Sequence, residues 1–174
     1  MHAALAHPKL AEIFRLLRDG RHLCLEDGEL YTALEENAEG FSELFNALGY
    51  GLKPHRKGIY YFHGDAAVTD TARRFAMFTF ILVEYLGDSG QGIEEALFTS
   101  SFEVEELPHL KSDRYRETMA EMGVSNTEDL GKLVRSMERF GFATADGDQV
   151  RFRRPMYRLI DLCVRVLETE EGAS

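Results

Sequence analysis

Apolar residues recur every three or four positions in several separate stretches of the chain, which is the spacing that places them on one face of an α-helix. This spacing predicts helices over residues 9–18, 26–37, 42–48, 69–86, 113–122 and 127–140, and a closing helix that carries Leu159 to Leu167. Glycines 20, 40 and 141 are expected to end helices, because glycine adopts the left-handed conformation without steric cost. Residues 93–110 fit no single pattern, and we expect one or two short helices that end before Pro108.

Two stretches have the extended, turn, extended pattern of a β-hairpin. In the first, residues 49–53 and 59–62 are predicted strands around a turn at 54–58; in the second, Asp146-Gly147 supplies a tight turn within residues 142–153. Each hairpin follows short helices, which is the element order of a winged-helix module. The sequence therefore predicts a mainly α fold with small β-hairpins, arranged as tandem winged-helix domains over residues 1–66 and 67–174, although no residue-level repeat is visible.

The predicted helix 69–86 is apolar nearly all round and has more apolar surface than one small winged helix needs. One interpretation places these side chains in the core of their own domain. The other places them between the two halves or against a second copy of the chain. The candidate interface residues are Phe75, Phe78, Ile81, Leu82 and Tyr85. The pattern alone leaves both interpretations open.

The formal net charge of −10 disfavours autonomous DNA binding, so any DNA contact has to come from a local patch. Residues 132–158 hold seven basic and three acidic residues, a net charge of +4 that leaves −14 elsewhere. The candidate DNA-binding residues are Lys132, Arg135, Arg139, Arg151, Arg153, Arg154 and Arg158. They lie where a winged helix presents its recognition helix and wing. Arginine donates hydrogen bonds to phosphate as readily as to guanine, so we expect sequence-independent binding. The alternative is a solvated face paired with neighbouring acids.

A second basic group, formed by Lys53, His55, Arg56 and Lys57, lies on the first predicted wing. It could contact DNA or an acidic partner, but the composition is more typical of an ordinary solvated turn.

No residue pattern points to catalysis, a cofactor or a metal. The two cysteines, Cys24 and Cys163, are far apart and lack the spacing of a disulfide framework or a zinc site. The six histidines are scattered, and no phosphate-binding loop or nucleophile motif is present. The N-terminal residues lack the pattern of a signal peptide, and no apolar run approaches the length of a membrane span. We expect a cytoplasmic, non-enzymatic protein that needs no cofactor and contacts no membrane.

Four blocks resemble the MukE and MksE subunits that bind the kleisin of bacterial SMC (condensin) complexes, in order from about residue 10 to 167. The most specific is the string Leu17-Arg18-Asp19-Gly20-Arg21-His22-Leu23 at the end of the first helix. The others are the aromatic strand at 58–62, the apolar helix 73–86, and residues 137–142 with the Asp-Gly wing and the closing helix.

The resemblance implies tandem winged-helix domains, a homodimer, capture of a MukF/MksF-like kleisin, and loading of DNA beside a MukB/MksB-like SMC ATPase. On this interpretation the protein is nucleoid-associated and grips a kleisin segment in apolar grooves between wings and helices, while its basic strip contacts DNA. The biological role would be chromosome organisation and segregation or plasmid defence.

Two other functions remain open from the sequence. A stand-alone winged-helix transcriptional regulator would bind an operator selectively without partners, although the acidic net charge disfavours it. A hydrolase with an unrecognised site would show turnover, but the sequence indicates no catalytic residue for such an activity.

Overall fold

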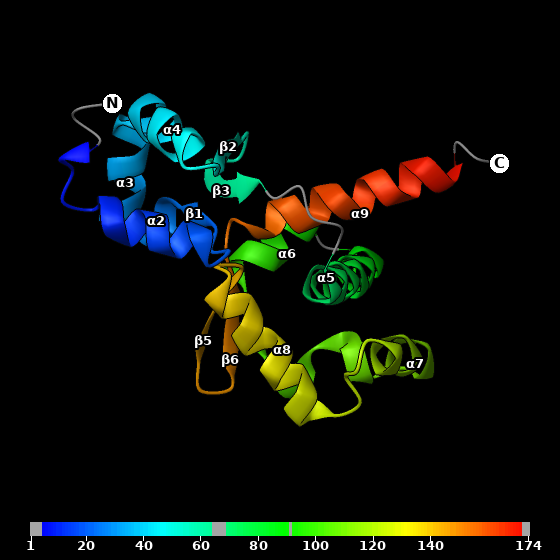
Figure 1. The fold of residues 1–174 in the computed structure, drawn as a ribbon. Helices are drawn as coiled ribbons and strands as arrows, with labels where there is room; N and C mark the ends of the chain where they lie inside the picture. The colour runs from blue at the N-terminus through cyan, green and yellow to red at the C-terminus, as the bar shows by residue number, and fades with distance from the viewer. Residues whose placement is uncertain (1–4, 64–68, 91, 172–174) are drawn as a thin grey trace. The chain divides into compact units, whose positions relative to one another are not determined.

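The chain divides into two compact units, Met1–Ala66 and Ala67–Ser174, each with its own hydrophobic core. The computed structural model describes residues 5–63, 69–90 and 92–171, with side chains up to residue 164. Helices dominate, and two small antiparallel sheets of three strands accompany them (Figure 1). The predicted fold class, mainly α with small β-hairpins, is confirmed. None of the described helices is both long and apolar enough to cross a membrane.

The first unit holds three described helices and one sheet. Its elements are α2 (Leu10–Arg18), β1 (Leu23–Cys24), a 3₁₀ turn (Leu25–Asp27), α3 (Glu29–Glu36), α4 (Ala38–Ala47), β2 (Gly51–His55) and β3 (Ile59–His63). Strand β3 lies at the centre of the sheet, between β1 and β2. The helices bury Ile13, Leu17, Leu34, Phe41 and Phe45 against it.

The second unit repeats this order with an added helix at each end and one further 3₁₀ turn. Its elements are α5 (Asp70–Asp88), α6 (Ile93–Thr99), β4 (Phe102–Glu103), two 3₁₀ turns (Val104–Glu106 and Pro108–Leu110), α7 (Asp113–Glu121), α8 (Thr127–Arg139), β5 (Ala143–Asp146), β6 (Gln149–Phe152) and α9 (Met156–Glu171). The sheet order is β4-β6-β5, so the second strand of the hairpin is again central.

A two-residue strand completes each sheet, and neither was predicted. β1 pairs with β3 through Leu23 and Cys24, and β4 pairs with β6 through Phe102 and Glu103. Each short strand leads directly into a 3₁₀ turn, so the two units share a structural repeat that the sequence does not display. Two residues are too few to show the alternation of a strand. Their strand conformation depends instead on the partner strand across the sheet.

Two predicted helix boundaries in the first unit are wrong. The helix predicted from residue 26 begins at Glu29, because the Asp27 carboxylate accepts the Cys24 amide at 2.9 Å and holds residues 25–27 in a tighter turn. Gly40 ends no helix and lies inside α4, which begins at Ala38 instead of residue 42. The break between α3 and α4 is at Asn37, whose side-chain amide donates to the Ala33 carbonyl at 3.0 Å.

The turn of the first hairpin is shorter than predicted. Pro54 lies in strand β2, in register with Tyr60, and the strand continues to His55. β2 is an edge strand, where the missing N–H of proline is tolerated. Gly58 closes the turn with a φ of 69°, a conformation that favours glycine.

The string at residues 17–23 has a structural role. Gly20 ends α2 with a φ of 89°. Arg21 then donates to the Asp27 carboxylate at 3.1 Å, and the buried ring of His22 stacks on Tyr61 with 5.6 Å between ring centroids. These contacts hold the chain as it passes from α2 into β1.

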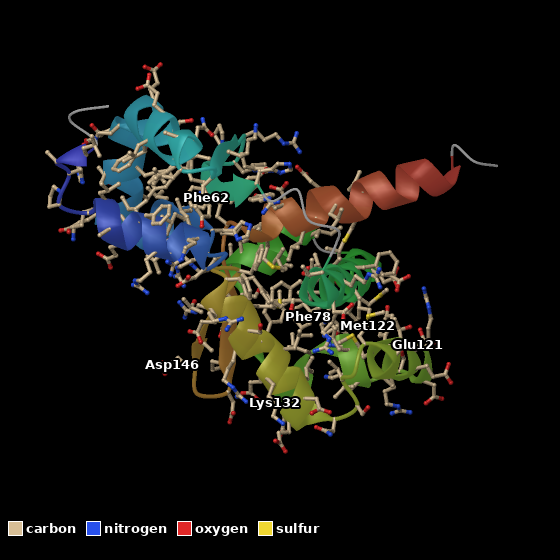
Figure 2. The ribbon with its side chains drawn as sticks, in the orientation of Figure 1. Phe62, Phe78, Glu121, Met122, Lys132 and Asp146 are labelled. Atoms are coloured by element: carbon tan, nitrogen blue, oxygen red, sulfur yellow. The ribbon has the colours of Figure 1, made fainter. Side chains whose placement is uncertain are left out.

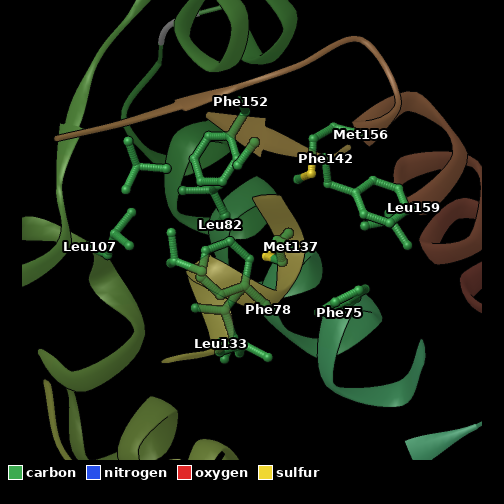
Figure 3. Close-up of a cluster of buried hydrophobic side chains, with 14 of the residues drawn as sticks. Phe75, Phe78, Leu82, Leu107, Leu133, Met137, Phe142, Phe152, Met156 and Leu159 are labelled. Atoms are coloured by element: carbon green, nitrogen blue, oxygen red, sulfur yellow. The ribbon is translucent and has the colours of Figure 1, made fainter. Parts of the chain in front are cut away.

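The apolar side chains of α5 form the core of the second unit (Figure 3). Phe75, Phe78, Ile81 and Leu82 are at most 3% exposed. Their burial within their own unit supports the core interpretation and removes these four from the candidate interface. Tyr85 is 44% exposed and is the one of the five that an outside partner can reach.

One buried histidine lies in this core. The His109 ring stacks on Phe78 with 3.9 Å between ring centroids, and its Nε2 lies 2.8 Å from the Phe78 carbonyl oxygen. Nδ1 has no hydrogen-bond partner among the described residues. Burial lowers the pKa of His109 to about 4, despite the opposing effect of the backbone hydrogen bond. The folded protein therefore holds this imidazole neutral at pH values where the unfolded chain protonates it.

We expect the second unit to lose stability as the pH falls from about 6.5 to about 4, because the unfolded state binds a proton that the folded state excludes. The shift corresponds to about 3 kcal/mol of unfolding free energy at the end of this window. Urea unfolding of wild type and His109→Phe at several pH values measures the effect as the difference between the two pH profiles. Parallel profiles would contradict it.

Candidate nucleic-acid interface

Helix α8 and the β5–β6 wing form one frame in the second unit (Figure 1). The Asn126 side chain accepts the Asp129 amide at 2.9 Å and fixes the start of α8. The inward face of the helix is apolar and buries Leu130, Leu133, Val134 and Met137. Glu138 accepts the Ala145 amide at 3.0 Å, which ties the last turns of α8 to strand β5. Helix and wing thus keep a fixed relation to each other.

Arg153 is buried within this frame and does not belong to an exposed basic strip. Its side chain is 4% exposed and donates to the Gly141 carbonyl at 3.1 Å. Its backbone amide donates to the Phe142 carbonyl at 2.9 Å. The prediction of a phosphate contact for Arg153 is corrected on this ground: the residue joins the end of the wing to the turn that follows α8.

The charge of Lys132 is already paired. Its Nζ lies 2.8 Å from the Glu128 carboxylate and 3.8 Å from that of Asp129, and the hydrogen bond to Glu128 raises the pKa of the ammonium. Figure 2 shows this side chain on α8. A phosphate would have to compete with both carboxylates.

Arg135 and Arg151 are the candidates best placed to receive phosphate. Both are exposed, and neither makes a hydrogen bond or ion pair with the residues that the structure describes. Arg151 lies on the outer face of β6, in register with exposed Thr144. Arg139 is also exposed, with its guanidinium 4.9 Å from the Phe140 ring centre.

Arg154 and Arg158 are less accessible than these three. Both are half-buried where the chain passes from β6 into α9. The predicted set of seven is therefore divided by the structure into three exposed arginines, one paired lysine, two half-buried arginines and one buried arginine.

A groove separates α8 from the wing, and its charge is opposite to that of a phosphate site. Its apolar lining comes from Val104, Val134, Ala145 and Val150. Three acidic side chains, Glu105, Glu128 and Asp148, line it together with Arg135. The exposed wing tip adds Asp146, which Figure 2 labels.

Sequence reasoning missed two features of this region. Arg74 lines a hollow with Lys132 and Ser136 between α5 and α8. The sequence feature that could have indicated it is the pair of adjacent arginines, 73 and 74, at the start of an apolar helix. Gly131 lines the groove beside the wing, and a glycine in the middle of a well-patterned helix was the signal there.

The first wing carries its own basic residues. Lys53 and Arg56 are exposed, Lys57 is half-buried, and residues 51–63 contain no acidic residue. The charge of this hairpin makes it a second candidate contact for DNA or for an acidic partner.

Among the described residues, no group of three or more His, Cys, Asp or Glu side chains is placed to hold a metal ion. Burial raises the pKa of the Cys163 thiol to about 11, so this cysteine is a weak nucleophile.

Comparison with known proteins gives one informative result. Residues 8–164, about nine-tenths of the chain, are similar to the family model described as condensin complex protein MksE. No curated protein matches the sequence.

Replacing Arg153 by alanine should lower the unfolding free energy by about 2 to 4 kcal/mol, because it leaves a buried carbonyl without its donor and removes packed atoms. Arg151→Ala, on the exposed face of β6 two residues earlier, should change the unfolding free energy by less than about 0.5 kcal/mol. Urea unfolding of both variants is the measurement, and equal effects would refute the distinction between these arginines.

Proposed function

The chain belongs to the MksE family of condensin complex proteins, and we propose that within such a complex it binds the kleisin subunit and contacts DNA without sequence specificity. The family match carries the assignment to a condensin complex as an accessory subunit. We further propose that its partners are a MukF/MksF-like kleisin, a MukB/MksB-like SMC ATPase, DNA and a second copy of this chain.

The architecture supports a role in binding. Each unit has the helix, short strand, helix, helix, hairpin order of a winged-helix domain, which presents a helix and a wing to a partner. The described residues contain no metal-binding group, and both cysteines are buried. We propose a non-enzymatic subunit that supplies surfaces to the ATPase and the kleisin.

For DNA, we propose that Arg135, Arg139 and Arg151 contact the phosphate backbone. Exposed guanidinium groups donate to phosphate oxygens and release condensed counterions, which favours binding without reading the bases. Lys132, Arg154 and Arg158 are proposed as secondary contacts that need a side-chain rearrangement. Because the whole chain carries −10, we expect DNA to bind the assembled complex more tightly than the isolated subunit.

Co-expression of this chain with a candidate MukF/MksF-like kleisin from the same genome tests the proposal. The expected result is a stable complex containing two copies of this chain, with DNA affinity above that of the isolated chain. Absence of a complex, together with selective operator binding by the isolated chain, would replace the proposal with a stand-alone regulator. The role in chromosome organisation or in plasmid defence is then decided by deleting the gene and measuring nucleoid segregation and plasmid retention.

Charge reversal of Arg135 and Arg151 to glutamate should weaken DNA binding by the complex and lower the slope of log K against log salt by about 2, one unit for each lost phosphate contact. Fluorescence anisotropy over a range of salt concentrations measures both quantities.

The matched control reverses Arg15 and Arg18, two exposed arginines of α2, and changes the net charge equally. The control should leave the salt slope unchanged. Equal losses in both variants would mean that overall charge, and not this surface, governs binding.

A further inference from the structure

The packing of the isolated chain does not explain why residue 131 of α8 is a glycine. A glycine in a helix interior destabilises the helix relative to alanine. Residue 131 lies in the interior of the helix Thr127–Arg139. A Cβ built there would have only the flexible end of Arg135 within 4 Å, at 3.6 Å. Nothing among the described residues therefore requires a glycine at this position.

The missing side chain leaves space in the groove between α8 and the wing. Gly131 lines that groove beside Val104, Val134 and Val150. A larger side chain would extend over this apolar lining and narrow the groove. A glycine at this position is explained if atoms of another molecule occupy the space beside it in the groove.

The charges of the groove indicate what kind of molecule that is. The carboxylates of Glu105 and Asp148 make no hydrogen bond or ion pair with the described residues, while Glu128 is paired with Lys132. Two unpaired acids outnumber the one cation, Arg135. DNA phosphate is repelled by such a site, whereas a cationic side chain is attracted to it.

We propose that the groove between α8 and the wing binds an extended segment of the kleisin that carries an aliphatic residue beside a lysine or arginine. This inference rests on the proposed function, because it takes the kleisin as partner. The aliphatic side chain packs on Val134 and Val150 across from Gly131. The neighbouring cation pairs with Glu105 and Asp148, which lie on the turn after β4 and on the wing.

The assignment also separates two surfaces of one frame. Exposed Arg139 and Arg151 lie outside the groove lining and are the proposed DNA contacts, while the groove receives the protein partner. Arg135 lines the groove and is exposed, so it lies where the two surfaces meet.

Gly131→Leu is the sharpest test, because it fills the groove while it improves the helix propensity of α8. The melting temperature should equal or exceed that of wild type, yet the affinity for the kleisin should fall on the order of tenfold or more. Gly131→Ala is the matched control, with a similar gain in stability and a smaller loss of affinity. Isothermal titration of each purified chain with the kleisin measures the affinities.

A charge test uses the double substitution Glu105→Lys and Asp148→Lys. It should also weaken kleisin binding on the order of tenfold, with a larger loss at low salt. Wild-type affinity in both this variant and Gly131→Leu would overturn the groove assignment while leaving kleisin binding intact. Failure of the wild-type chain to bind the kleisin would instead overturn the proposed function.

Discussion

Helix α5 passes through the core of the second unit, and the position of the elements around it depends on how its apolar side chains pack. Phe78 contacts the ring of His109 on one side and Phe152 of the wing on another, with ring centroids 3.9 and 5.8 Å apart. Phe75 contacts the two aromatic residues that flank Gly141, Phe140 and Phe142. The end of α8 and the start of the wing are thus held against one helix, and both candidate surfaces depend on that packing.

The same frame supports two different chemistries. Buried groups such as Arg153 and Glu138 join helix to wing by hydrogen bonds to the backbone. Residues on its outside divide into exposed arginines and an acidic, apolar-lined groove. The two surfaces share one frame and overlap at a single residue: Arg139 and Arg151 lie outside the groove lining, whereas Arg135 is exposed and also lines the groove.

Most helices and both hairpins could be predicted from the sequence, because their signals are local. The apolar period of α8, its Asn126 cap and the Asp-Gly turn of the second wing are each contained within a few residues. Strands β1 and β4 were not predictable, since two residues adopt strand conformation only where a distant strand pairs with them. The break at Asn37 was misplaced to Gly40 because glycine is the stronger general signal, whereas the asparagine acts through its own side-chain hydrogen bond.

The candidate site was predictable only as a region. Charge counting found residues 132–158, but it could not show that Arg153 points inward or that Glu128 and Asp129 pair with Lys132 from the preceding turn. Burial depends on tertiary packing, and the groove is formed by three separate segments of the chain, at residues 104–105, 127–135 and 145–150. The apolar face of α5 was ambiguous for the same reason: a core helix and an interface helix have the same pattern.

Hydrogen–deuterium exchange of this chain, free and bound to the kleisin, would locate the partner on the surface of the second unit. We expect slower exchange on binding in residues 103–106, in the α8 segment around Gly131 and in residues 145–150, with little change in α7. A complex that protects only other segments, and leaves the groove exchanging as in the free chain, would contradict the groove assignment.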